Sequence, residues 1–225
     1  MITISNLSKE YKKKVIFNNL NLKIPENKIT FISGPNGSGK STLLKCLLKL
    51  EDYNGEIRYD NCHFEKVREE VMVVYDNSPL YHNLTGSQNL ELLTNNSFKN
   101  IYENNHDILM PHFLKPEILK DKVKNYSLGQ KKKLSLMRVL LTKPKYLFLD
   151  EASNGLDHET LLDLKSLLRK LSVDTTIIAI GHHFEYYTSI IDDLILINDQ
   201  SAIQIKDFEL QEGEGLNDIY ERYIK

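Results

Sequence analysis

The sequence predicts an α/β fold in which helical crossovers connect the strands of a sheet. Short apolar runs that are typical of buried strands alternate with longer stretches whose leucines recur at helical spacing. A glycine-rich loop joins one of these strands to one of these helices. Alternating strands and helices favour a parallel sheet, because each crossover helix covers one face of it. A length of 225 residues allows one domain with a substantial buried core.

The first third of the chain is expected to be rich in strands. The apolar pattern predicts them over residues 2–5, 15–17, 20–24, 27–33, 55–60 and 69–76. Between the fourth and the fifth of these, residues 40–50 place leucines at helical spacing directly after the glycine-rich loop. The loop is therefore expected to connect a buried strand to a helix.

The rest of the chain begins with an insertion of different composition. Residues 80–125 are rich in Asn, His, Leu and Lys and are expected to be mostly helical. The alternation then resumes, with helices predicted over residues 129–142 and 158–172 and strands over 145–151 and 175–181. The runs 193–199 and 201–206 predict a closing hairpin.

Composition excludes several classes of protein. The chain has 29 Lys and Arg against 31 Asp and Glu, a formal net charge of −2, so no nucleic-acid partner is expected. Cys46 and Cys62 cannot form a disulfide framework, which favours a reducing compartment. The start of the chain does not have the pattern of a signal peptide, and no apolar run approaches the roughly 20 residues needed to cross a bilayer. A cytoplasmic location is expected.

The glycine-rich loop fits the phosphate-binding pattern G-x-x-x-x-G-K-[ST]. It consists of Gly34, Pro35, Asn36, Gly37, Ser38, Gly39, Lys40 and Ser41. Glycines allow the backbone to approach a phosphate chain closely, and the N-terminus of the following helix adds partial positive charge. Lys40 supplies a full charge, and the Ser41 hydroxyl can ligate Mg²⁺. Because a strand precedes the loop and a helix follows it, the pattern predicts a nucleotide site.

A second candidate for this site lies where the strand 145–151 ends. Asp150 and Glu151 follow four apolar or aromatic residues, so the strand delivers two carboxylates to the edge of the sheet. Asp150 can hold Mg²⁺ directly or through water. Glu151 points elsewhere and can polarise a water molecule as a general base.

With these motifs, the chain resembles the ATP-binding-cassette (ABC) ATPases over nearly its whole length. Tyr126-Ser127-Leu128-Gly129-Gln130 is similar to the family signature L-S-G-G-Q and precedes a predicted helix. Ser153-Asn154-Gly155-Leu156-Asp157 resembles the D-loop, and His182 stands where the family has its switch histidine. Tyr11 stands where an aromatic ring stacks on adenine.

The resemblance implies a P-loop NTPase core with an N-terminal antiparallel β subdomain and a helical insertion. It implies one domain over residues 1–225, with the helical subdomain at about 78–128. The cofactors it implies are ATP and Mg²⁺. ATP would contact Tyr11, the loop from Gly34 to Thr42 and, across the interface with a second protomer, Ser127, Gly129 and Gln130. Mg²⁺ would be held by Ser41, Asp150 and Asp76, with Glu151 and His182 as the catalytic residues.

Three positions depart from the family pattern. Asp76 replaces a glutamine that reaches Mg²⁺ and the attacking water, His183 replaces an aspartate, and Leu128 replaces a glycine of the signature. Because His183 adjoins His182, either residue could be the switch histidine, and the family spacing favours His182. The lysine runs 12–14 and 131–133 are expected to form a solvated loop and a solvated helix face.

The resemblance implies the energy-coupling ATPase of an ABC transporter, with an exporter expected rather than an importer. A separate transmembrane subunit would place it on the cytoplasmic face of the cell membrane, and the segment 80–125 would carry the groove that receives this subunit. The alternative is an ABC ATPase outside transport, for example in iron–sulfur assembly. A module that binds ATP without hydrolysing it stays open because of Asp76.

Overall fold

The computed structural model describes residues 1–77, 79–95, 114–206 and 215–224. Its central sheet has six strands in the order β5-β6-β7-β3-β8-β9. The strands are β3 (Ile29–Ser33), β5 (Val71–Val74), β6 (Tyr146–Asp150), β7 (Thr176–Ile180), β8 (Asp193–Asn198) and β9 (Ser201–Ile205). All neighbours pair in parallel except β8 and β9, which form the predicted hairpin. The predicted α/β fold is confirmed.

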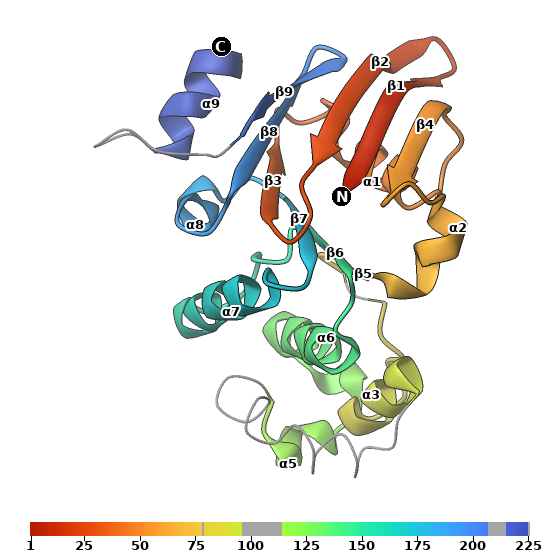
Figure 1. Ribbon diagram of the computed structural model, residues 1–225. Helices are drawn as coiled ribbons and strands as arrows, with labels where there is room; N and C mark the ends of the chain where they lie inside the picture. The colour runs from red at the N-terminus through yellow and green to blue at the C-terminus, as the bar shows by residue number, and fades with distance from the viewer. Residues whose placement is uncertain (78, 96–113, 207–214, 225) are drawn as a thin grey trace.

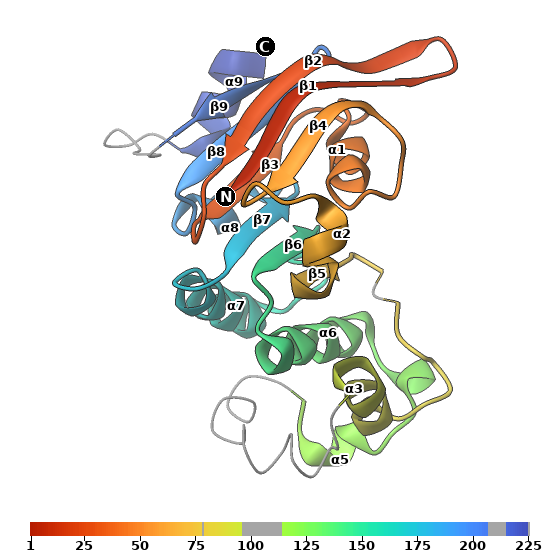
Figure 2. The ribbon, with the colours of Figure 1, turned by 45° about the vertical axis from the view of Figure 1, so that its right-hand side comes forward.

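The second sheet is antiparallel and lies at the N-terminal end of the chain. Its order is β2-β1-β4, from β1 (Ile2–Tyr11), β2 (Lys14–Ile24) and β4 (Asn54–Tyr59). The two runs predicted over residues 15–17 and 20–24 form the single strand β2. As Figure 2 shows, β1 and β2 make a long hairpin, and Tyr11 ends β1 beside its turn.

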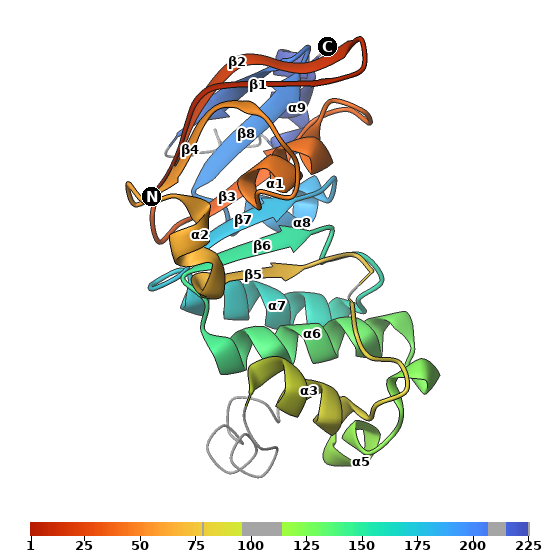
Figure 3. The same cartoon turned by 90° about the vertical axis from the view of Figure 1, so that its right-hand side faces the viewer.

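The layers are clearest in Figure 3. Helix α1 (Lys40–Leu47) lies between the antiparallel sheet and the six-stranded sheet, and α6 (Leu128–Thr142) and α7 (His158–Leu171) cover the opposite face. Strand residues alternate between the two layers, as β geometry requires. In β6, Tyr146 and Phe148 face the α1 side, whereas Leu147 and Leu149 face the other side.

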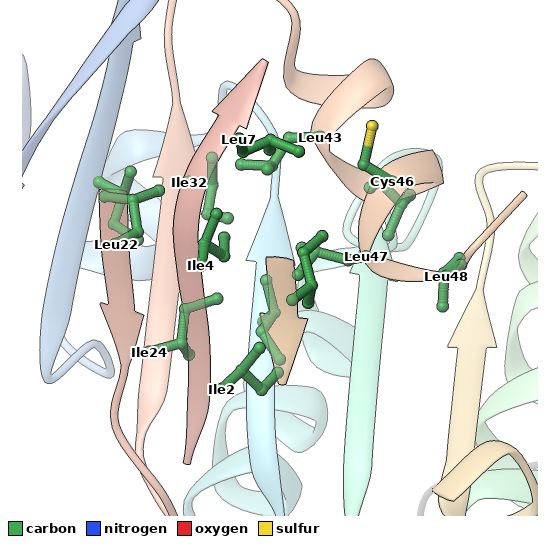
Figure 4. Packing of buried hydrophobic residues seen from close by; sticks show 14 of the residues in the cluster. Ile2, Ile4, Leu7, Leu22, Ile24, Ile32, Leu43, Cys46, Leu47 and Leu48 are labelled. Carbon is green, nitrogen blue, oxygen red and sulfur yellow. The ribbon is translucent and has the colours of Figure 1, made fainter. Parts of the chain in front are cut away.

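The core beneath α1 packs the helix that follows the phosphate loop against both sheets. Leu43, Cys46 and Leu47 of α1 are fully buried against Ile4 of β1 and Ile32 of β3 (Figure 4). Cys46 is therefore a packed side chain, and burial raises the pKa of its thiol to about 11. Burying a leucine such as Leu43 or Leu47 stabilises the fold by about 1.5–3 kcal/mol. The helix that begins at the phosphate loop is thus held on two sides.

The described parts of the segment 80–125 are helical. They comprise α3 (Gly86–Thr94), α5 (Pro116–Leu119) and the 3₁₀ helix η2 (Val123–Asn125). They lie below α6 in Figure 1, away from the antiparallel sheet, and α3 packs on α6. Part of this predicted insertion, residues 96–113, lies outside the described residues. The division into one domain with a helical subdomain at about 78–128 stays a prediction.

Side-chain caps explain where two long helices begin. Ser127 caps α6 through a capping box, in which its Oγ accepts from Gln130 N and Gln130 Oε1 accepts from Ser127 N. Asp157 caps α7 by accepting from Thr160 N at 2.8 Å. Both caps belong to motifs identified in the sequence, so these motifs also position their helices.

Four short elements were not predicted. They are α2 (Phe64–Val67), the 3₁₀ helix η1 (Arg68–Glu70), α8 (Phe184–Thr188) and α9 (Leu216–Ile224). Three have at most five residues, too few for an apolar period to register in the sequence. Among the described residues, no helix combines the length and the apolar character that crossing a membrane requires.

Candidate functional site

The predicted phosphate loop joins β3 to α1. Gly37 has φ of 79°, and a Cβ there would meet nothing within 4 Å, so the loop presents bare backbone to open space. Gly39 has φ of 112°, and a Cβ there would lie 2.8 Å from both Ile16 Cγ2 and Phe17 Cζ. A side chain at Gly39 would therefore drive the loop away from β2. This arrangement fits a ligand that contacts backbone N–H groups, such as a phosphate chain.

Lys40 is folded across the loop. Its Nζ donates to the carbonyl oxygens of Gly34 at 2.8 Å and Pro35 at 3.0 Å. Burial lowers the pKa of Lys40, and the nearby carboxylates of Glu151 and Asp150 oppose this shift. A buried ammonium beside exposed loop backbone is suited to neutralising a polyphosphate.

A pocket of about 220 Å³ brings the predicted catalytic residues to the phosphate loop. Its lining residues come from β2, the loop, α1 and the ends of β6 and β7, and they are Ile16, Asn36, Gly37, Gly39, Lys40, Ser41, Thr42, Glu151 and His182. Glu151 and His182 lie more than 100 positions from the loop in the sequence. The parallel sheet unites them because the carboxyl ends of its strands meet at one edge.

Asp150 ends β6 at the same edge. Its pKa is raised by burial and by the negative charges of Glu151 and Asp76, while Lys132 and Lys40 oppose the rise. A half-buried carboxylate crowded by other carboxylates favours a divalent cation as its partner. Among the described residues, no group of three or more His, Cys, Asp or Glu could hold a metal ion. The carboxylate of Asp150 and the hydroxyl of Ser41 are oxygen donors of the kind that Mg²⁺ takes, and the Mg²⁺ site stays a prediction.

Glu151 adopts a left-handed conformation, with φ of 51°. For a residue other than glycine this conformation costs about 1–2 kcal/mol, so the surroundings must hold it. Glu151 N donates to Ile180 O at 2.9 Å, and Asn154 Nδ2 donates to Glu151 Oε2 at 2.7 Å. The carboxylate is thus fixed in the pocket by a residue three positions later.

The two neighbouring histidines have different surroundings. His182 lines the pocket, and burial together with the charge of Lys40 lowers its pKa, which Glu151 opposes. The Nδ1 of His183 lies 3.2 Å from Ser153 Oγ and shares a hydrogen bond with it. The geometry therefore supports His182 as the residue that can face a bound phosphate, while its function stays a prediction.

The signature residues do not line this pocket. Ser127, Gly129 and Gln130 lie at the N-terminus of α6, where Ser127 and Gln130 form the capping box. Leu128 between them is 70% exposed. A site completed by the signature of a second protomer, which the resemblance implies, accounts for this separation without requiring the two motifs to meet in one chain.

Tyr11 lies near the phosphate loop without lining the pocket. Its hydroxyl is hydrogen-bonded to Glu51, and this bond raises the pKa of Tyr11 and is the main cause that lowers the pKa of Glu51 to about 2. Lys9 Nζ lies 4.6 Å from the centre of the ring. Thr42 of α1 also contacts the hydroxyl, so the ring is anchored beside the helix that follows the loop.

The lysine runs give one confirmed and one wrong prediction. Lys12, Lys13 and Lys14 are exposed, as expected. Lys132 is only 4% exposed, and its Nζ donates to Asp76 Oδ1 at 2.9 Å. Helical spacing could have indicated this, because Lys132 shares the buried face of α6 with Leu136 and Val139. Both Lys132 and Asn154 contact site residues in ways that the motifs did not reveal.

The comparisons with known proteins agree with this geometry. A sequence profile of the ABC transporter family matches residues 17–154. The lantibiotic transport ATP-binding protein SrtF of Streptococcus pyogenes is 30% identical over 226 residues, covering 100% of this chain and 97% of the relative. The bacitracin transport ATP-binding protein BcrA of Enterococcus faecalis is 29% identical, covering 91% of this chain and 68% of the relative.

Another relative is named for the transport of a different compound. The glutamine transport ATP-binding protein GlnQ of Bacillus subtilis is 26% identical, covering 91% of this chain and 89% of the relative. A solved structure of the ATP-binding subunit of an ABC transporter matches with a TM-score of 0.87 at 19% identity, covering 99% of this chain and 98% of the other. That match shows the fold. With the profile matched over more than half of its length, the chain belongs to the ABC transporter family, as an ATP-binding subunit.

Proposed function

We propose that this chain hydrolyses ATP and thereby drives an ABC transporter whose membrane subunit is a separate polypeptide. The single observation that carries the proposal is the pocket that brings Lys40, Glu151 and His182 together. It combines a phosphate-neutralising cation, a carboxylate positioned as a base and an imidazole with a lowered pKa. Phosphoryl transfer to water is assisted by cations that neutralise the phosphates and by a group that orients the attacking water.

The residues divide the reaction between them. The loop from Gly34 to Thr42 binds the phosphates, with Lys40 neutralising their charge, and Tyr11 stacks on the adenine ring. Ser41, Asp150 and Asp76 hold Mg²⁺, which when bound neutralises charge on the phosphates. Glu151 accepts a proton from the attacking water, and His182 hydrogen-bonds to the γ-phosphate.

A second protomer completes each site in this proposal. Ser127, Gly129 and Gln130 lie at a helix N-terminus, where backbone N–H groups and the helix dipole favour a phosphate. Leu128, 70% exposed between them, supplies an apolar contact that association would cover. The two protomers, identical or related, would close head to tail on two ATP molecules.

The membrane subunit is proposed to dock in a groove of about 450 Å³ beside β5. The groove is lined by Leu48, Lys49, Leu50, Phe64, Glu65, Arg68, Val71, Val73 and Tyr75. These residues lie before the segment 80–125, in which the groove was expected. Leu50 is 63% exposed, which suits an amphipathic helix as the occupant. Docking there would place the chain on the cytoplasmic face of the cell membrane.

Transport is favoured over the alternative in iron–sulfur assembly, because the relatives are named for the transport of lantibiotic, bacitracin and glutamine. Export is the direction that we propose. A transport assay would test this direction, because a relative named for glutamine transport matches this chain as well.

Phosphate release from Mg·ATP by the purified chain tests the proposed hydrolysis. Wild-type protein should release phosphate, and the Glu151→Gln variant should bind ATP but release phosphate very slowly, because the base is lost while the phosphate contacts remain. Light scattering of this variant should detect a dimer with ATP and a monomer without it. ATP binding by the wild type without phosphate release would overturn the proposal in favour of a module that only binds ATP.

A further inference from the structure

A buried lysine connects three segments next to the pocket. Lys132 of α6 is 4% exposed, and its Nζ donates to Asp76 Oδ1 at 2.9 Å, to Glu151 O at 3.0 Å and to Asn154 O at 2.9 Å. An ammonium group has three donors, and here each has an acceptor. Burying a charge without partners is costly, so these three contacts hold the side chain in place.

Two of the three acceptors belong to the turn that carries the Glu151 carboxylate. Within this turn, Asn154 N donates to Glu151 O at 3.1 Å, and Asn154 Nδ2 donates to Glu151 Oε2 at 2.7 Å. Glu151 is left-handed, with φ of 51°, and so needs external support. Lys132 supplies it, because its ammonium binds the carbonyl oxygens at both ends of the turn.

The third acceptor, Asp76, is the neighbour in sequence of a residue that lines the groove beside β5. Asp76 follows Tyr75, which lines the groove beside β5, and the Asp76 side chain is 49% exposed. Asp150 and Glu151 place two further negative charges near this position. The ammonium of Lys132 offsets this repulsion and holds Asp76 toward α6. A displacement of the segment after β5 would therefore pull on the cation that supports Glu151.

We propose that Lys132 is a positioning residue for Glu151, and that its ion pair with Asp76 connects the groove segment to the turn 151–154. This inference rests on the proposed ATP hydrolysis. Lys132 does not line the pocket itself, and it contacts the lining residue Glu151 at its backbone carbonyl oxygen, so it acts through the backbone of the turn.

The test compares Lys132→Met with Lys131→Met in the full chain. Methionine keeps the volume of the stem and removes the ammonium, and Lys131 is a less buried neighbour on the same helix. In Lys132→Met we expect kcat for phosphate release to fall about 10- to 100-fold, as misplacement of a catalytic group does. The Kd for ATP should stay within about twofold, since the phosphate loop is untouched. Lys131→Met should keep the wild-type kcat.

A second measurement separates positioning from general stability. Hydrogen exchange of the peptide covering residues 151–157 should become faster in Lys132→Met and not in Lys131→Met. Should Lys132→Met fail to fold, Lys132→Gln carries the test, because its amide keeps hydrogen-bond donors in the buried site while the positive charge is removed. That variant should lower kcat in the same direction, again without weakening ATP binding.

The outcomes are distinct. A lower kcat with unchanged ATP affinity and faster exchange in the turn supports the inference. An unchanged kcat, or a parallel loss of kcat and ATP affinity, overturns it, because Lys132 would then be a structural cation or a phosphate contact. If the wild type itself binds ATP and releases no phosphate, the proposed function fails first, and that failure is visible without any Lys132 variant.

Discussion

The side-chain amide of Asn154 donates a hydrogen bond to the carboxylate of Glu151, with 2.7 Å between Nδ2 and Oε2. The two residues are three positions apart in a turn whose first residue is left-handed. This contact orients a carboxylate that would otherwise rotate about its side-chain bonds, so the proposed base is fixed before a substrate arrives. Such preorganisation removes an entropic cost from the reaction.

Asn154→Ala should lower kcat for ATP hydrolysis by about tenfold, or about 1.4 kcal/mol of barrier, because Glu151 loses its orienting donor. Steady-state phosphate release measures this, and ATP affinity should be unchanged. Asn154→Asp is the contrasting variant. It keeps the shape but places a second negative charge against Glu151, and it should lower kcat further. A wild-type kcat in Asn154→Ala would show that the contact does not matter for turnover.

Lys40→Ala should abolish tight ATP binding and turnover while the chain still folds. The Lys40 contacts are hydrogen bonds to loop carbonyls, and α1 is held separately by the core beneath it. Titration with a fluorescent ATP analogue measures binding, and circular dichroism measures whether the variant folds. Lys170→Ala, a change of an exposed lysine on α7, is the control and should bind ATP as the wild type does. Full activity of folded Lys40→Ala would contradict the assignment of the phosphate loop.

Turnover should have an acid limb set by His182. Burial and Lys40 lower its pKa below the ordinary value of about 6.5, so the neutral imidazole persists to a lower pH than in a free histidine. Turnover should therefore be complete above about pH 6.5, and it should be lost as the pH falls through the lowered pKa of His182 in the folded protein. His182 should likewise destabilise the fold as the pH falls from about 6.5 through its lowered pKa, because the unfolded chain binds the proton more readily than the folded chain does.

A pH profile of kcat/KM, which reports the pKa values of the ATP-free chain, tests this limb with His182→Gln and His183→Gln. His183 shares its hydrogen bond with Ser153 and should leave the limb unchanged. In His182→Gln the remaining activity should show no such limb. The assignment of His182 would be wrong if the limb followed His183 instead.

Asp150→Asn should stabilise the chain in buffer containing a chelator and eliminate Mg²⁺-dependent hydrolysis. The raised pKa of Asp150 means that its charge is a cost in the folded state, which is present at neutral pH and relieved as the pH falls through that pKa. A gain of about 1 kcal/mol would raise Tm by about 2–4 °C for a chain of this length. Thermal unfolding by calorimetry measures it, and a lower Tm would show that Asp150 is stabilised by contacts rather than strained.

The sequence alone predicted the features that depend on neighbouring residues. The strand, loop and helix around Gly34–Ser41 follow from apolar period and glycine placement, because backbone conformation there is a local property. The same holds for Asp150 and Glu151 at the end of β6, and for the helix that follows the signature. The predicted fold class was therefore confirmed, although the boundaries of individual strands shifted.

Tertiary structure decided which side chains meet. The run 131–133 contains three consecutive lysines, and the packing of α6 against the sheet buries Lys132 while its two neighbours are less buried. Its partner Asp76 lies 56 positions away, and the pocket unites Lys40 with His182 across a greater separation. Sequence spacing does not encode such pairs, because strand order and helix rotation, both set by burial of the whole core, bring the side chains together.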